Sequence, residues 1–210
     1  MLGPSAHIDT FARDNLPAVE LLPEFKLGSF QYPEKLNAGY ELTDAMVEKG
    51  FGDYTALIGN GRQRTYKELA DWTNRLAHVL RDDLGIVPGN RVLIRSANNP
   101  AMVACWLAAT KVGAVVVNTM PMLRAHELQK YVEKAEISHA LSDKRLIDEL
   151  QECARTCKSL RKVVGFDGSS NHDAELDRLA LEKPVNFDTV KTGRDDVALL
   201  GFTSGSTGEP

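Results

Sequence analysis

The stretch that decides the fold lies at residues 91–118 and reads RVLIRSANNPAMVACWLAATKVGAVVVN. It begins with the mainly apolar run Arg91–Arg95, which predicts a strand. Asn99 can then cap a helix, and Pro100 suits the first helical position because its missing N–H would have no partner there. The helical pattern ends before 114–117, a run that is apolar without alternation, as in strands covered on both faces. The stretch therefore predicts a strand, a helix and a second strand.

The same alternation continues on both sides of this stretch. Thr65 and Glu68 fit a capping box at the start of a long helix, and Gly85 supplies its left-handed stop. Strands that alternate with single helices imply right-handed crossovers, so we predict an α/β fold with a largely parallel sheet flanked by helices on both sides. The further elements expected are helices at 43–49, 128–135, 146–157 and 176–181, and strands at 56–58, 138–141, 162–166 and 197–202.

The first 42 residues show no sustained hydrophobic period and are rich in Pro, Gly, Asn and Tyr, which is typical of irregular chain. Their apolar side chains, among them Phe25, Phe30 and Tyr32, argue against disorder. We therefore predict two parts. An extended N-terminal arm at 1–42 lies over a larger body, and that body is an α/β subdomain at 43–210.

Charge and hydropathy exclude several classes of protein. The 210 residues include 25 Lys and Arg against 29 Asp and Glu, which gives a net charge of −4 without any basic block. This pattern argues against a surface for nucleic acid or anionic membrane. The start lacks an apolar signal region, and the apolar runs fall far short of the roughly 20 residues that span a bilayer. We expect a cytoplasmic protein that binds no nucleic acid and no membrane.

The cysteines and histidines do not show the spacing of metal ligands, so we predict no metal site among them. No CxxC pair is present, and reduced, partly buried thiols are expected, two of them on one helix face. The histidines are expected at the surface or in satisfied polar positions. These residues are Cys105, Cys153, Cys157, His78, His126 and His139.

Five further side chains invite a functional interpretation that we set aside. Lys111, Arg95 and Arg124 could contact phosphate groups or CoA, but charges at element ends are commonly solvated, and we expect that here. Trp72 and Trp106 lie on apolar helical faces and are expected to pack in the core rather than to stack on a ligand ring.

The chain ends with GFTSGSTGEP at 201–210, at the end of the last predicted strand. Successive Gly and Ser residues can turn their N–H groups toward one point and form a nest for an anion, and the hydroxyl groups add donors. Open α/β sheets bind ligands beyond the carboxyl ends of their strands. The spacing fits neither GxxxxGK[ST], nor GxGxxG, nor GxSxG. A flexible linker is the alternative, but the preceding strand favours a loop for a polyphosphate.

Three motifs in this order resemble the adenylate-forming superfamily of acyl-CoA and aryl-CoA synthetases. Residues 202–210, FTSGSTGEP, resemble its signature loop, [YF]-T-S-G-[ST]-T-G-x-P-K-G. Upstream, RTYKELADWTNRLAHVL at 64–80 resembles its T-Y-x-E-L helix motif, and LAATKVGAVVVNTMPMLRAHEL at 107–128 its Gly-Ala strand motif. The arm segment FQYPEKLNAGYELTDAMVEKG at 30–50 and the stretch at 119–141 resemble benzoate- and 2-aminobenzoate-CoA ligases. The resemblance covers essentially the whole chain.

The resemblance implies a two-step reaction. An aromatic carboxylic acid attacks the α-phosphate of ATP to give an acyl-adenylate and pyrophosphate, and the CoA thiol then displaces AMP. The loop implied to hold the β- and γ-phosphates, with Mg²⁺ nearby, acts by position and charge, so no catalytic residue is assigned in this chain. Its residues are Thr203, Ser204, Gly205, Ser206, Thr207 and Gly208.

The signature continues with a Lys-Gly pair that this chain does not contain, and the family's later segments carry the adenine, ribose and acid pockets and a catalytic lysine. We therefore expect an amino-terminal fragment that is inactive by itself. The alternative is a stable non-catalytic module that associates with another subunit, or with itself, through apolar surface.

Overall fold

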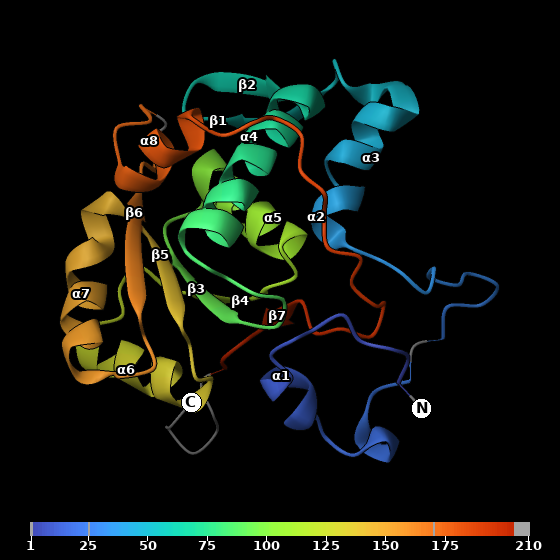
Figure 1. The fold of residues 1–210 in the computed structure, drawn as a ribbon, viewed down its shortest axis with the longest axis horizontal. Coiled ribbons are helices and arrows are strands. Elements are labelled where there is room, and N and C mark those ends of the chain that lie inside the picture. Colours follow the sequence, from blue (N-terminus) through green and yellow to red (C-terminus); the bar gives the residue numbers. More distant parts are fainter. Residues whose placement is uncertain (1, 25, 170, 204–210) are drawn as a thin grey trace.

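The computed structural model describes residues 2–24, 26–169 and 171–203. In this part of the chain a five-stranded sheet forms the centre, in the order β6-β5-β3-β4-β7, and every neighbouring pair is parallel (Figure 1). The predicted α/β fold with a largely parallel sheet is confirmed. The strands are β3 (Arg91–Arg95), β4 (Val115–Thr119), β5 (His139–Asp143), β6 (Lys162–Phe166) and β7 (Leu199–Leu200).

Helices cover both faces of this sheet, as predicted. Along β3, Val92 and Ile94 belong to the core under one group of helices, whereas Leu93 points into the core under the other group. This alternation follows from the two-residue period of a strand. The first group is α4 (Tyr66–His78), α5 (Pro100–Lys111) and α8 (Glu175–Leu181), and the second is α6 (Ala125–Lys134) and α7 (Ile147–Thr156).

The helix starts follow the caps expected from the sequence. Thr65 and Glu68 form both hydrogen bonds of a capping box, with the Thr65 hydroxyl accepting at 3.2 Å and Glu68 accepting the Thr65 N–H at 2.8 Å. The Asn99 side chain accepts the Met102 N–H at 2.9 Å, and Pro100 takes the first turn of α5. One difference lies at the end of α4, which widens into a π-helical turn, η3 (Val79–Asp83).

A two-stranded hairpin precedes α4. It consists of β1 (Thr55–Gly59) and β2 (Arg62–Thr65), which pair antiparallel. Asn60 and Gly61 connect them with φ angles of 53° and 70°, a left-handed pair that matches the twist of a two-residue hairpin turn. The expected strand at 56–58 and its tight turn are therefore present.

The first 42 residues include short helices as well as extended chain, and they pack on the body of the protein. The backbone N–H groups of Ile8 and Asp9 donate to the Pro88 carbonyl at 2.9 and 3.0 Å. Arg91 pairs with Asp9 at 2.6 Å and lies over the Phe11 ring at 4.4 Å. The elements up to the hairpin are α1 (Phe11–Asp14), η1 (Val19–Leu21), α2 (Ala38–Glu41), α3 (Asp44–Met46) and η2 (Val47–Phe51).

One expected surface charge is buried instead. Lys111, at the end of α5, has no exposed side-chain area. Its ammonium group pairs with the Asp44 carboxylate and donates to Asn74 Oδ1 at 2.5 Å. Burial lowers the pKa of Lys111, and Asp44 opposes this shift. The expectation of a solvated lysine is wrong because α3 and α4 enclose the end of α5.

Candidate functional site

The carboxyl ends of β3 and β5 lie side by side where the connections from these two strands run in opposite directions. From β3 the chain passes to β4 on one side, and from β5 it passes to β6 on the other. Such a switch point opens a crevice, and open α/β sheets bind ligands there. The strand order therefore places a candidate site at this edge of the sheet.

A cavity of about 460 Å³ lies at this edge. Its walls come from segments that directly follow three parallel strands and from the start of α7. Three guanidinium groups and two carboxylates border it. The lining residues are Arg95, Pro121, Met122, Arg124, Arg145, Leu146, Asp148 and Glu149.

Arg95, the last residue of β3, is the buried cation of this cavity. It is only 2% exposed, and its Nη2 donates to the Pro121 and Leu123 carbonyls at 2.7 Å each. Its Nε and Nη1 find no hydrogen-bond partner in the described part of the chain. Burial lowers the pKa of Arg95, and the nearby Glu149 carboxylate opposes this shift. The expected solvated charge is wrong here also, because helices cover both faces of β3.

The other two arginines of the cavity already have carboxylate partners. Arg124 pairs with Glu149 at 2.5 Å, and its side chain is 71% exposed, as expected of a surface charge. Arg145 pairs with the buried Asp143 at 2.5 Å. Arg95 therefore gives the cavity a positive charge that no carboxylate in the described part of the chain pairs with, and the two paired guanidinium groups lie nearby. Charge-assisted hydrogen bonds of this kind are the strong ones in proteins.

The sequence carried a signal for this site that we set aside. Arg95 ends a strand with apolar residues on both faces. Such a strand is covered on both sides, so a charge at its end is shielded from water. Arg145 was not considered as a site residue at all. The feature that indicates Arg145 is its position just after β5, because residues that follow parallel strands meet at one edge of the sheet.

The predicted phosphate loop begins at the same edge. β7 pairs with β4 through Leu199 and Leu200 only, so the strand is shorter than the expected 197–202. Beyond it, the Phe202 ring packs on Tyr131 of α6 with 4.3 Å between ring centroids. Thr203 follows and is exposed. The remaining predicted loop residues lie outside the described part of the chain: Ser204, Gly205, Ser206, Thr207 and Gly208.

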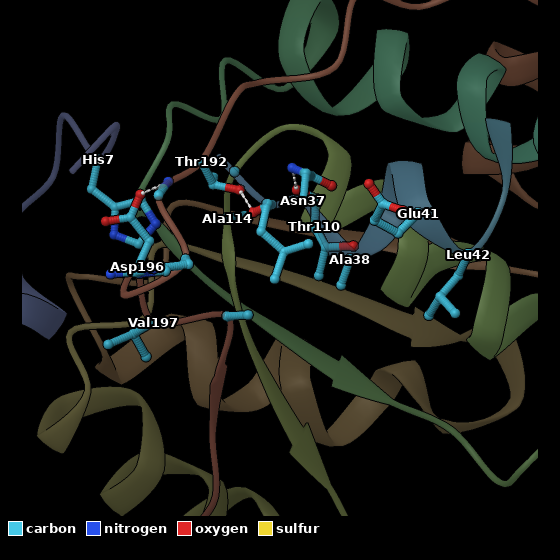
Figure 2. Close-up of a pocket in the computed structure, with 15 residues that line it drawn as sticks. His7, Asn37, Ala38, Glu41, Leu42, Thr110, Ala114, Thr192, Asp196 and Val197 are labelled. Carbon is cyan, nitrogen blue, oxygen red and sulfur yellow. Dashed lines mark hydrogen bonds between the residues drawn. The ribbon is translucent and has the colours of Figure 1, made fainter. Parts of the chain in front are cut away.

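A second cavity, of about 310 Å³, lies at the opposite end of β4 and β7 (Figure 2). Its polar side chains serve to hold the arm. Asn37 donates to the Thr110 and Val190 carbonyls at 2.7 and 3.0 Å, and Thr192 donates to the Leu36 carbonyl at 2.6 Å. We assign this cavity to the packing of the arm rather than to chemistry.

The isolated side chains set aside earlier take mostly structural positions. His139 is buried and bonded to Ser138 Oγ and the Leu84 carbonyl, at 2.8 and 3.1 Å. Trp72 and Trp106 are partly buried against the core. The Cys153 and Cys157 sulfurs lie 3.5 Å apart as free, buried thiols.

Across 2–24, 26–169 and 171–203 there is no cluster of three or more His, Cys, Asp or Glu side chains arranged to hold a metal ion. In the same ranges, every helix is too short or too polar to cross a membrane.

Known proteins resemble this chain in sequence. Residues 45–210 match the model of the AMP-binding enzyme family. An uncharacterized acyl–CoA ligase, YtcI of Bacillus subtilis (strain 168), is 30% identical over 178 residues, which cover 81% of this chain and 33% of the relative. The 3-hydroxybenzoate–CoA ligase of Aromatoleum sp. (strain CIB) is 27% identical over 175 residues, which cover 83% of this chain and 33% of the relative. The chain thus spans about a third of the length of these relatives.

Solved structures show the same fold. The anthranilate CoA ligase AuaEII, in complex with anthranoyl-AMP, superimposes with a TM-score of 0.76 at 19% identity and covers 85% of this chain, which matches 34% of that protein. ATP-bound MatB from Rhodopseudomonas palustris gives a TM-score of 0.69 at 24% identity. The match covers 83% of this chain and 34% of MatB. Because the family model matches well over half of the residues, this chain belongs to the AMP-binding enzyme family.

Proposed function

We propose that this chain is the ATP-binding part of an acid–CoA ligase that activates an aromatic carboxylic acid. The observation that carries the proposal is the place of the Gly- and Ser-rich loop. In a member of the AMP-binding enzyme family, it starts at Thr203, shortly after β7, at the carboxyl edge of a parallel sheet. Relatives named for benzoate and 3-hydroxybenzoate support the aromatic acid as substrate.

In this proposal the loop holds the β- and γ-phosphates of ATP. Backbone N–H groups and hydroxyls donate to the phosphate oxygens, so that pyrophosphate is held in line as the carboxylate attacks the α-phosphate. The residues proposed for this role are Thr203, Ser204, Gly205, Ser206, Thr207 and Gly208. Mg²⁺ accompanies the phosphates. It is usually bound by one or two carboxylates together with phosphate and water, so it does not require a protein cage.

The cavity at Arg95 completes the proposal as a second anion site. ATP and CoA are the two phosphate-bearing substrates, and the loop serves ATP. We therefore assign the positive charge of the Arg95 guanidinium, with Arg124 and Arg145 beside it, to a phosphate of CoA. The shared edge of the sheet brings both substrates to one side of the protein, which the transfer of an acyl group from AMP to CoA requires.

The test is acid-dependent exchange of pyrophosphate into ATP. The product of the complete reading frame should exchange with benzoate or 2-aminobenzoate, whereas the 210-residue chain alone should not, since it spans about a third of its relatives.

Thr203→Val should lower exchange about tenfold or more, because a hydroxyl donor to phosphate is lost. Thr189→Val is the matched control, since its hydroxyl has no partner in the described residues. Absence of exchange with every benzoate and fatty acid would contradict the enzyme proposal.

A second candidate function is a non-catalytic module that associates with another subunit or with itself. It is favoured by large apolar side chains exposed on β7 and just after its neighbour β4. Leu199 is 49% exposed, Met120 62% and Met122 80%. Exposed apolar area of this kind promotes association. Light scattering should then report a dimer or larger species, and a monomer at all concentrations would count against this function.

A further inference from the structure

A third cavity, of about 270 Å³, lies between the hairpin, α4 and α8, and it shares no lining residue with the cavity at Arg95. Figure 1 shows these three elements side by side on one face of the molecule. Arg62 and Arg64 come from β2, Trp72 and Arg75 from α4, and Asp177 and Leu181 from α8.

Arg64 is the unusual residue of this cavity. It is only 5% exposed, yet no acceptor in the described part of the chain takes a hydrogen bond from its guanidinium group, and Nη1 is closed off from solvent. Its guanidinium group lies over the Trp72 ring, whose centroid is 5.0 Å from Cζ. A buried charge without an ionic partner costs several kcal/mol, and burial accordingly lowers the pKa of Arg64.

The carboxylates on the wall do not supply the missing partner. Glu68 pairs with Arg62 at 2.7 Å. Asp71 pairs with Lys67 at 2.6 Å. Each of these acids is thus neutralised by a neighbour other than Arg64.

Asp177 is also occupied. Its Oδ2 accepts the Asp167 N–H at 2.8 Å, and its Oδ1 lies 3.4 Å from His172 Nδ1. Burial raises the pKa of this carboxyl group, so its negative charge is disfavoured. Arg75 donates to the Leu181 and Lys183 carbonyls, at 2.9 and 2.5 Å, and has no carboxylate partner among the described residues. The charge left unbalanced around the cavity is therefore positive.

The remaining wall is apolar and aromatic, from Trp72, Ala180 and Leu181. A water molecule occupies about 30 Å³ of liquid, so the cavity has room for a small organic molecule. We propose that it binds a small organic carboxylate, whose two oxygens accept the Nε and Nη2 N–H groups of Arg64, the ones that are not closed off, while its apolar body lies against Ala180 and Leu181. An arginine fork matches a carboxylate with two parallel hydrogen bonds. Thr203, where the proposed phosphate loop starts, is not among the residues that line this cavity.

The test uses calorimetry and thermal unfolding of the purified chain with sodium benzoate, sodium hexanoate and inorganic phosphate at equal ionic strength. The two carboxylates should give saturable heats and raise the Tm, whereas phosphate should not. Arg64→Met should weaken carboxylate binding about tenfold or more, because charged hydrogen bonds are lost. The same variant without ligand should unfold at an equal or higher temperature, since an unpaired buried charge is removed.

Two further variants keep the test decisive. Arg64→Lys keeps the charge without the fork and should bind more weakly than wild type, even if Arg64→Met does not fold. Arg155→Met, at an exposed arginine of α7 on the other side of the sheet, is the matched control and should bind normally. Thr203→Val should also bind normally, which separates this site from the proposed ATP loop.

Three results would overturn the proposal. The first is the absence of saturable heat with either carboxylate at millimolar concentration. The second is equal affinity in wild type, Arg64→Met and Arg64→Lys. The third is a large loss of thermal stability in Arg64→Met with unchanged binding, which would make the stacking of Arg64 on Trp72 purely structural.

Discussion

Lys111 joins three helices through one buried ammonium group. It ends α5, its carboxylate partner Asp44 begins α3, and Asn74 belongs to α4. Burial by itself would raise the pKa of Asp44, but hydrogen bonds from Lys111 and Asn74 outweigh this and hold that pKa below its usual range. The pair thus ties the segment before the hairpin to the body of the protein.

Removal of one partner of the Lys111–Asp44 pair should destabilise the folded protein strongly. We expect Asp44→Ala to lower the free energy of unfolding by about 3–5 kcal/mol, because Lys111 is left as an unpaired buried charge. Urea unfolding measures this change. The double variant Asp44→Ala/Lys111→Met should recover most of the loss, and Asp53→Ala, at an exposed aspartate, should change little. A loss in the double variant as large as in Asp44→Ala would contradict the ion-pair interpretation.

The same carboxylate predicts a pH dependence. Because the folded-state pKa of Asp44 is depressed, its contribution is fully present above the unfolded-state pKa of about 3.9 and is lost as pH falls through the folded value. The difference in unfolding free energy between wild type and Asp44→Asn should therefore be constant above about pH 5 and shrink below about pH 4. A difference that stays constant down to pH 2 would show that Asp44 does not titrate as proposed.

At the scale of elements, the stability of α4 depends on the capping of its first turn. Thr65 and Glu68 satisfy two N–H groups that would otherwise lack partners in the first turn. The π-helical turn that follows α4 ends at Asp83, and Gly85, with φ of 72°, then turns the chain toward β3. A short local signal thus sets where the helix begins, while packing sets how it ends.

Loss of the Thr65 cap should lower the free energy of unfolding by a moderate amount. We expect Thr65→Ala to destabilise the protein by about 1 kcal/mol in urea unfolding, because the hydroxyl that accepts the Glu68 N–H is removed. Thr65→Ser keeps the hydroxyl and should cost clearly less. Equal losses for the two variants would point to the lost methyl group rather than to the cap.

At the scale of the whole molecule, the strand order brings distant residues to one edge. Arg95 ends β3, while Arg124 and Arg145 follow β4 and β5, and the three line one cavity only because β5 and β4 lie on either side of β3. The proposed ATP loop starts at this edge too. The sheet therefore acts as the frame that brings the two proposed anion sites to one edge.

This arrangement predicts a selective defect. Arg95→Met in the complete protein should weaken CoA binding about tenfold and leave ATP binding nearly unchanged, because only the CoA phosphate is assigned to Arg95. Isothermal calorimetry with each nucleotide measures both affinities. Arg155→Met serves again as the exposed control. Equal weakening of both ligands would instead assign the cavity to a general role in the fold.

Local sequence predicted much of this architecture. Caps, glycine stops and apolar runs are short-range features, so α5, β3, β6 and the capping box of α4 follow from a few residues each. The final strand is shorter than expected, since it pairs with β4 through Leu199 and Leu200 only. Of the predicted phosphate loop, only Thr203 lies within the described part, and the roles of all six residues stay predictions.

The sequence by itself determined the α/β class, the starts of the main helices and the family resemblance of the final loop. Only the tertiary structure decided the order of the strands and which charges are buried. Lys111 meets Asp44, 67 positions earlier, and Arg64 lies beside an α8 that begins at Glu175. No local pattern places such distant segments, because burial depends on which elements pack together rather than on the residue's own neighbours in the chain.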